Sequence, residues 1–228
     1  MKKKNLILTG GIRHNFDENT NAISKILNEA GFENKIEENL DEGFELIAKD
    51  DFDLVTVMAL QWQMNNSPKY RPYKQKWGFK TSKKIKTIFE EYINSGGGLF
   101  GFHTACLCFD DWPEWKKILG GTWKWGSSYH PPNSPVKVFR TRTKHNITEN
   151  IDSFTLNDEI YSNLSTENSI NVLMEAKLIN GDDLQPVLWT NKYGSGKIAY
   201  DGLGHDKDSI ENPTHTEIIK KCALWASK

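Results

Sequence analysis

The chain has 228 residues, of which 37% are hydrophobic and 26% are charged, and its formal net charge at pH 7 is −1. This length and composition favour one globular domain over residues 1–228, and the near-zero charge argues against nucleic acid as an obligate partner. The apolar run near the N-terminus covers only residues 6–8, too short for a signal peptide or a membrane span. Three cysteines make a poor disulfide framework, so we expect a cytoplasmic protein with reduced thiols.

The first half of the chain alternates predicted strands and helices. Apolar runs and glycine stops predict strands at residues 5–11, 34–39, 52–60 and 99–103, and helical periodicity predicts helices at 16–32, 41–50 and 81–98. This order is typical of a mostly parallel sheet with helices on both faces. Residues 61–80 are aromatic, basic and rich in proline and glycine, which predicts a long loop that serves as a lid or pocket wall.

The second half has a different character. After a turn-rich stretch at residues 120–135, strands are expected at 136–141, 154–164 and 170–178. Residues 185–205 predict two strands joined by a Gly-Ser-Gly turn, an added antiparallel hairpin, and an amphipathic helix closes the chain at 213–228. No internal repeat or low-complexity linker divides the sequence.

The sequence contains eight tryptophans, and several of them lie in polar segments. Aromatic rings in loops can line a pocket and offer flat apolar faces to sugar rings. The alternative is that they pack small apolar clusters beneath long loops. The pattern alone leaves both interpretations open.

Three of the six histidines lie where a site is expected. His103 directly follows the apolar residues 99–102, His205 directly follows residues 198–204, and His14 follows the first strand by a few residues. Ligands bind outside the carboxyl ends of strands in open parallel sheets, so these three side chains are expected to converge. The alternative for each is a histidine that only makes structural hydrogen bonds. We expect His215 to be structural or exposed, while the roles of His130 and His145 stay open.

Two further features concern buried polar chemistry. Glu159 lies in the strand-like "NDEIY" and can face inward only if it is paired, hydrogen-bonded or metal-bound, with Asp158 as its solvent-facing neighbour. Cys106 and Cys108 form a C-x-C pair, which is not a zinc motif by itself. A lowered thiol pKa at a helix start is one interpretation, but small buried packing residues are favoured.

These segments together resemble one family. "GGGLFGFHTAC", "DWPEWKKILGGTWKWGSSYHPP", "FTLNDEIY" and "PVLWTNKYGSGKIAYDGLGHD" are similar to blocks of the ThuA-like, or trehalose-utilisation, domain, over nearly the whole chain. The resemblance implies a flavodoxin-like fold of the class I glutamine-amidotransferase type. The amidotransferases carry their nucleophilic cysteine in a G-x-C-x-G elbow, whereas "GFHTA" has His103 there, which argues against glutamine hydrolysis.

The elbow histidine suits a different chemistry. With His14, Glu159 and His205 it would form a nitrogen and oxygen site for a divalent metal, zinc or manganese. No nucleotide cofactor is expected. His103, Glu159 and His205 are the candidate catalytic residues, with Glu159 or His205 as the base. The candidate sugar-binding residues are Trp62, Trp112, Trp123, Trp125 and His130.

The family name implies a small-molecule carbohydrate substrate, a disaccharide or a keto-glycoside made by a partner sugar dehydrogenase. Metal-assisted hydrolysis, elimination or isomerisation is the favoured activity. A non-catalytic sugar-binding or regulatory domain is the alternative, and a cysteine hydrolase using Cys106 ranks third. Proteins of this fold often pair through sheet edges or helices, so a homodimer is one expected oligomeric state.

Overall fold

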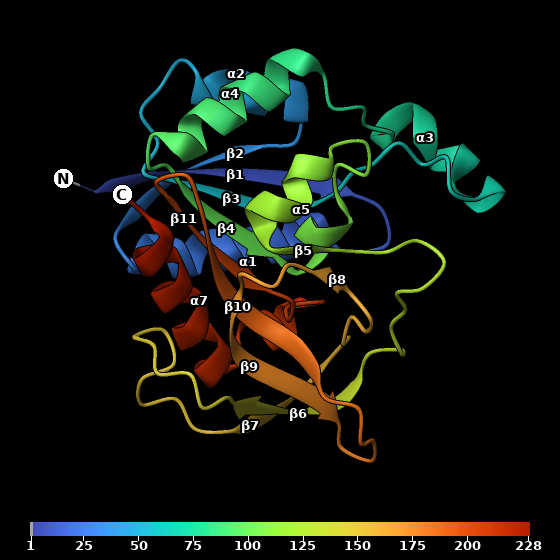
Figure 1. Ribbon diagram of the computed structural model, residues 1–228, viewed down its shortest axis with the longest axis vertical. Coiled ribbons are helices and arrows are strands. Elements are labelled where there is room, and N and C mark those ends of the chain that lie inside the picture. The colour runs from blue at the N-terminus through green and yellow to red at the C-terminus, as the bar shows by residue number, and fades with distance from the viewer. Residues whose placement is uncertain (1) are drawn as a thin grey trace.

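Nine strands form one continuous sheet within residues 2–228, the part of the chain that the computed structural model describes (Figure 1). Their order is β2-β1-β3-β4-β11-β10-β9-β6-β7. The strands of this sheet are β1 (Lys3–Gly11), β2 (Phe32–Glu37), β3 (Leu54–Leu60), β4 (Gly98–Phe102), β6 (Ser134–Arg140), β7 (Phe154–Asp158), β9 (Asn171–Leu178), β10 (Gln185–Tyr193) and β11 (Gly196–Asp201). β5 (Gly121–Thr122) and β8 (Ser165–Thr166) form a separate antiparallel pair.

The sheet has a parallel half and an antiparallel half. β2, β1, β3, β4 and β11 pair in parallel, in the flavodoxin-like order. β10 pairs antiparallel with β11 across the predicted Gly-Ser-Gly turn, so the hairpin is confirmed. The antiparallel part extends further than one hairpin, because β9, β6 and β7 continue the same sheet.

Helices cover both faces of the parallel half. The helices are α1 (Phe16–Glu29), α2 (Leu40–Ile47), α3 (Arg71–Trp77), α4 (Lys83–Asn94), α5 (Pro113–Leu119), α6 (Lys207–Ile210) and α7 (Pro213–Ala226), with short 3-10 turns η1 (Pro68–Tyr70) and η2 (His103–Leu107), and all but α3 pack on the sheet. Apolar residues of α1, α6 and α7 pack on one face, and those of α2, α4 and α5 pack on the other. The predicted α/β class is therefore confirmed. No helix among residues 2–228 is long and apolar enough to span a membrane.

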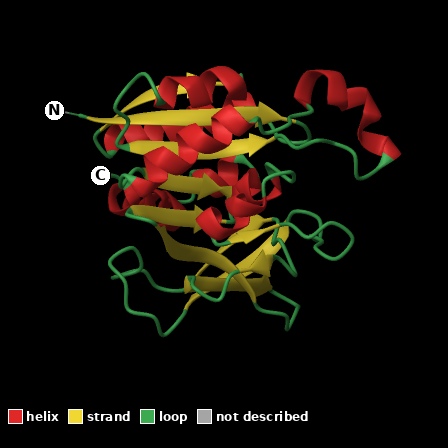
Figure 2. Cartoon of the chain, turned by 45° about the horizontal axis from the view of Figure 1, so that its top comes forward, coloured by secondary structure: helices red, strands yellow, loops and turns green. Residues whose placement is uncertain are grey.

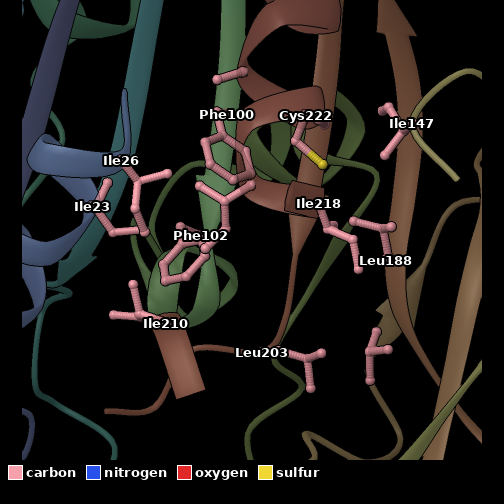
Figure 3. Close-up of a cluster of buried hydrophobic side chains, with 14 of the residues drawn as sticks. Ile23, Ile26, Phe100, Phe102, Ile147, Leu188, Leu203, Ile210, Ile218 and Cys222 are labelled. Atoms are coloured by element: carbon pink, nitrogen blue, oxygen red, sulfur yellow. The ribbon is translucent and has the colours of Figure 1, made fainter. Parts of the chain in front are cut away.

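The core explains why the central strands are almost wholly apolar. All seven residues of β3 are buried, as expected for a strand covered on both faces. Figure 3 shows one cluster of buried hydrophobic side chains, in which residues of α1, β4 and α7 point toward one another; among them are Ile23, Ile26, Phe100, Phe102, Ile218 and Cys222. Burial at this density makes the sheet a rigid platform for the loops at its carboxyl end.

The segment 61–80 is not the continuous loop that its composition predicts. It contains η1 and α3. Ser67 accepts a hydrogen bond from a free N–H group at the start of η1, and a proline, which has no N–H group, lies in the first turn of each helix, so both helix starts are stabilised. Figure 2 shows α3 projecting from the end of the molecule toward which the arrowheads of the parallel strands point. The segment therefore stands at the edge where a ligand site is expected.

The loop after β11 depends on Gly204. Its φ is +100°, and a Cβ built there would lie 2.2 Å from the ring of Phe102. Gly31 has a similar φ of +96°, but nothing lies within 4 Å of its Cβ position. An alanine at Gly31 would therefore add backbone strain alone, whereas an alanine at Gly204 would add both strain and steric overlap.

We predict that Gly204→Ala destabilises the protein more than Gly31→Ala. The strain common to both is about 1 kcal/mol, and the overlap with Phe102 adds about 1–3 kcal/mol. Urea unfolding of both variants measures the difference. Equal losses would show that the Phe102 contact does not restrict this loop.

Candidate functional site

Four side chains from four different loops meet at the carboxyl end of the sheet. His14 follows β1, His103 follows β4, Glu159 follows β7 and His205 follows β11. One potential ligand atom from each lies within 4.8 Å of the others. The structure thus brings together the four residues that the sequence marked as a metal-ligand set.

His103 occupies the elbow between β4 and η2 with a φ of 43°, a left-handed conformation that is uncommon outside glycine. Its Nδ1 lies 2.8 Å from the carbonyl oxygen of Gly202, which can only accept, so Nδ1 carries the proton. Burial lowers the pKa of His103 well below its usual range. The imidazole is therefore neutral, and its Nε2 lone pair points into the site and accepts a hydrogen bond from Tyr161 Oη at 2.9 Å.

His14 faces His103 in an arrangement that favours a cation. Their Nε2 atoms are 3.1 Å apart, and His14 Nδ1 points to the carbonyl oxygen of Ile12 at 3.4 Å. Burial, together with the nearby His205, lowers the pKa of His14 to about 4. Two neutral imidazoles thus direct their Nε2 atoms at the same space, and that of His103 also accepts a hydrogen bond from Tyr161. Two nitrogen ligands of a tetrahedral zinc are about 3.4 Å apart, given Zn–N bonds of ~2.1 Å.

Glu159 and His205 complete the cluster. His205 Nδ1 lies 3.2 Å from Glu159 Oε2, yet it is buried and makes no hydrogen bond. Burial raises the pKa of Glu159, but His205, His130 and His14 outweigh it and lower the pKa overall. The carboxylate in turn raises the pKa of His205. An ionised carboxylate beside an unsatisfied ring nitrogen is a polar arrangement that a bound ligand would complete.

These donors fit a divalent metal. Three imidazole nitrogens and a carboxylate oxygen suit zinc, and manganese would accept the same set with additional oxygen ligands. The Nδ1 hydrogen bond from His103 to Gly202 is the kind of outer contact that orients a metal-binding imidazole. His14, His103, Glu159 and His205 would hold the ion.

Asp158 is not the solvent-facing residue that strand alternation predicts. β7 ends at this residue, and its side chain is fully buried. Oδ1 accepts hydrogen bonds from the backbone N–H of Glu159 (2.7 Å) and His205 (3.1 Å), and Oδ2 accepts from Gly204 N–H (2.7 Å) and Ser209 Oγ. One carboxylate therefore joins the two loops that carry Glu159 and His205.

His215 belongs to the same buried polar network and is structural. Its Nδ1 donates to the carbonyl oxygen of Ser209 at 2.8 Å, and its Nε2 lies 3.1 Å from Asp201 Oδ2. Both ring nitrogens thus face acceptors; burial lowers the pKa of His215, but Asp201 and Asp158 raise it overall. Although Asp201, His215 and Ser209 are the residue types of a hydrolytic triad, Ser209 is 1% exposed and donates its hydroxyl to Asp158.

A cavity of about 420 Å³ opens above the cluster. Trp62, Trp123, Trp125 and His130, four of the predicted sugar-binding residues, line it. Trp62 is only 1% exposed and stacks on Trp125 at 5.4 Å between ring centroids, so the half-buried Trp123 and Trp125 present the accessible faces.

Trp112 does not line this cavity, contrary to the sequence interpretation. It is buried in the core between the sheet and α4 and α5, and its Nε1 donates to Glu90. Its neighbours Phe89 and Trp115 account for its position. The polar flanks of Trp112 reflect the turn before α5, not a ligand pocket.

The cysteines behave as packing residues. Cys106 and Cys108 are both buried, and burial raises the pKa of each thiol, to about 12 for Cys108. A thiolate nucleophile is therefore disfavoured at neutral pH.

His145, the remaining histidine, lies in the loop after β6, where its ring packs edge-on against Trp225.

Sequence reasoning missed Tyr161. Its ring stacks on His103 with 4.6 Å between centroids, and its pKa is raised well above the usual range by burial and by nearby acidic groups, so the phenol stays protonated. The available signal was its place two residues after Glu159 in "NDEIY".

The fold and the site together define a class of protein. It is an α/β protein with a histidine at the elbow and a cluster of histidines and a carboxylate at the strand ends. Residues 4–226 match the family described as ThuA, trehalose utilisation, and the chain belongs to that family. A putative ThuA-like protein from Parabacteroides merdae shares 19% identity, with a TM-score of 0.77 over 99% of this chain and 90% of its own. One from Bacteroides uniformis shares 20%, with a TM-score of 0.68 over 98% and 91%.

The fold also occurs as part of larger proteins. The chain is similar to a β-galactosidase from Bacillus circulans at 14% identity, with a TM-score of 0.59, but it covers only 31% of that enzyme. This similarity concerns the fold alone. No curated protein sequence matches the chain significantly.

We predict that Asp158→Asn lowers the free energy of unfolding by about 3 kcal/mol, because the amide nitrogen would face N–H or O–H donors that now have an acceptor. Asp208→Asn is the matched control, because Asp208 is exposed on α6, and it should change the free energy of unfolding by less than about 0.5 kcal/mol. Denaturant unfolding measures both. Similar values would remove Asp158 from its proposed role in joining the two loops.

Proposed function

We propose that this protein is a metal-dependent enzyme that acts on a carbohydrate, a disaccharide or a keto-glycoside. The observation that carries the proposal is the set of four potential ligand atoms within 4.8 Å of one another at the base of an aromatic cavity. A bound divalent ion would polarise a sugar carbonyl and acidify the adjacent C–H bond. Hydrolysis, elimination and isomerisation are the reaction classes that fit.

The protein residues divide into two groups. His14 and His103 are neutral and point their lone pairs inward, so they are the fixed part of the ligand set. Glu159 and His205 border the open cavity, so one can complete three protein ligands while the other moves a proton. Glu159 stays ionised and can accept a proton, and His205 retains one more readily than an ordinary histidine.

The cavity wall supports a sugar as the substrate. Trp123 and Trp125 offer apolar ring faces, and His130 and Tyr161 add polar groups at the same wall. This combination of flat apolar faces with a few polar atoms suits a pyranose ring. The family description, trehalose utilisation, is consistent with a glycoside.

The proposal also concerns the partner enzyme, the cellular location and the oligomeric state of the protein. A keto-glycoside substrate requires an oxidation step first, which a partner sugar dehydrogenase would supply. Two structural neighbours from Salmonella typhimurium are described as cytoplasmic proteins, which supports a cytoplasmic location here. A homodimer stays part of the proposal.

We predict that the purified protein binds about one divalent ion per chain and that His103→Ala loses it, because an inward-facing nitrogen ligand is removed. His145→Ala is the control, since His145 lies outside the cluster. Metal analysis after dialysis against zinc or manganese gives the stoichiometry. Equal metal content in the parent and His103→Ala would refute the site.

We predict turnover of a glycoside or 3-keto-glycoside that a chelator abolishes and the metal restores. Glu159→Gln should lower kcat by roughly 100-fold or more, because it removes both a charge in the cluster and a candidate base. A panel of disaccharides and their 3-keto forms, analysed by chromatography, is the measurement. Saccharide binding without turnover of any member would favour the non-catalytic binding domain instead.

A further inference from the structure

The cavity above the cluster carries two cations that the proposed metal chemistry does not use. Arg13, next to His14, and Lys69, in η1, both line it. Neither takes part in any ion pair formed within residues 2–228. Among the described residues that line the cavity, Glu159 alone is acidic, and it lies beside His130 and His205. Because Arg13 and Lys69 are both exposed, the mouth of the cavity has an excess of positive charge.

The backbone directs Arg13 toward this cavity. Its φ is 71°, so it is one of the few residues other than glycine in the left-handed region. In an extended segment, consecutive side chains point in opposite directions, whereas Arg13 and His14 both line the cavity. A conformation that is unfavourable for arginine is thus held where it adds a guanidinium to the site.

Aromatic rings hold both cations without neutralising them. The guanidinium of Arg13 lies 5.6 Å from the centre of the Tyr73 ring of α3, and Lys69 Nζ lies 4.8 Å from the ring of Tyr70. Such contacts orient a cation but leave its N–H groups free for an anion. The segment 61–80, which includes η1 and the projecting α3 (Figure 2), therefore contributes the charge of Lys69 as well as the rings of Trp62 and Tyr70 to the cavity.

We infer that the substrate is an anionic sugar, bearing a carboxylate or phosphate group that Arg13 and Lys69 bind at the mouth while the sugar ring lies against the tryptophans. This inference rests on the proposed function and narrows its substrate class. A planar guanidinium can bind either anion through two hydrogen bonds, and the ammonium adds a point charge. A neutral disaccharide would leave both cations without a partner in the complex.

The test is a binding titration of the purified protein, followed by tryptophan fluorescence and calorimetry. The probes are glucose, glucuronate, glucose 6-phosphate and inorganic phosphate. The parent should bind an anionic sugar at least tenfold more tightly than glucose, and this preference should weaken with added salt. Comparison of glucuronate with glucose 6-phosphate identifies the anionic group. Equal affinity for glucose and both anionic sugars would overturn the inference, as would phosphate alone binding as tightly as the sugar phosphate, or no sugar binding at all.

Variants separate these cations from the metal cluster, which could itself attract an anion. Arg13→Gln combined with Lys69→Gln should remove the preference for the anionic sugar, roughly tenfold or more in affinity, with unchanged metal content and circular dichroism. Lys76→Gln is the matched control, because Lys76 lies on α3 over Trp77 and does not line the cavity. A preference that persists in the double variant would overturn the inference. Selective anionic binding by a protein without metal or turnover would instead refute only the proposed function.

Discussion

The buried carboxylate of Asp158 is the interaction on which the site depends. It accepts hydrogen bonds from the backbone of Glu159, Gly204 and His205. β7 and β11 are not neighbours in the sheet, and some forty residues of chain separate them. Burial raises the pKa of this carboxyl group, and a fully buried carboxyl group is stable only if hydrogen-bond donors surround it. The requirement to satisfy Asp158 therefore also fixes the distance between the two loops.

The elbow adds a second constraint, which changes the chemistry of the fold. A strained turn usually serves to expose a nucleophile, but here it holds a histidine that is 2% exposed and whose Nδ1 is bound to Gly202. Burial keeps this imidazole neutral, and Tyr161 and His14 lie at the only nitrogen that remains free. The turn therefore presents a lone pair, which is suited to coordination or hydrogen bonding and not to acyl transfer.

The parts of the site that follow from strand ends were predictable from sequence. His14, His103 and His205 each follow an apolar strand of the parallel half, and the parallel geometry alone brings their loops to one edge. Asp158 and Trp112 were not placed correctly. Alternation along a strand assumes that the strand continues, whereas β7 ends at Asp158, and the polar neighbours of Trp112 concealed a core position. Tyr161 escaped because its role depends on stacking against a residue 58 positions away.

The antiparallel strands anchor residues of the site that the parallel half of the sheet does not supply. The parallel half supplies three histidines at an open edge, but it does not supply the carboxylate. The strands β9, β6 and β7 extend the sheet (Figure 1). The chain leaving β7 carries Glu159 into the cluster and stacks the ring of Tyr161 on His103 of the elbow. The turn-rich stretch before β6 adds Trp123, Trp125 and His130 on the same side. The cluster therefore acquires its carboxylate from the chain that follows β7 and part of its cover from the chain that precedes β6, so both depend on segments that the antiparallel strands anchor.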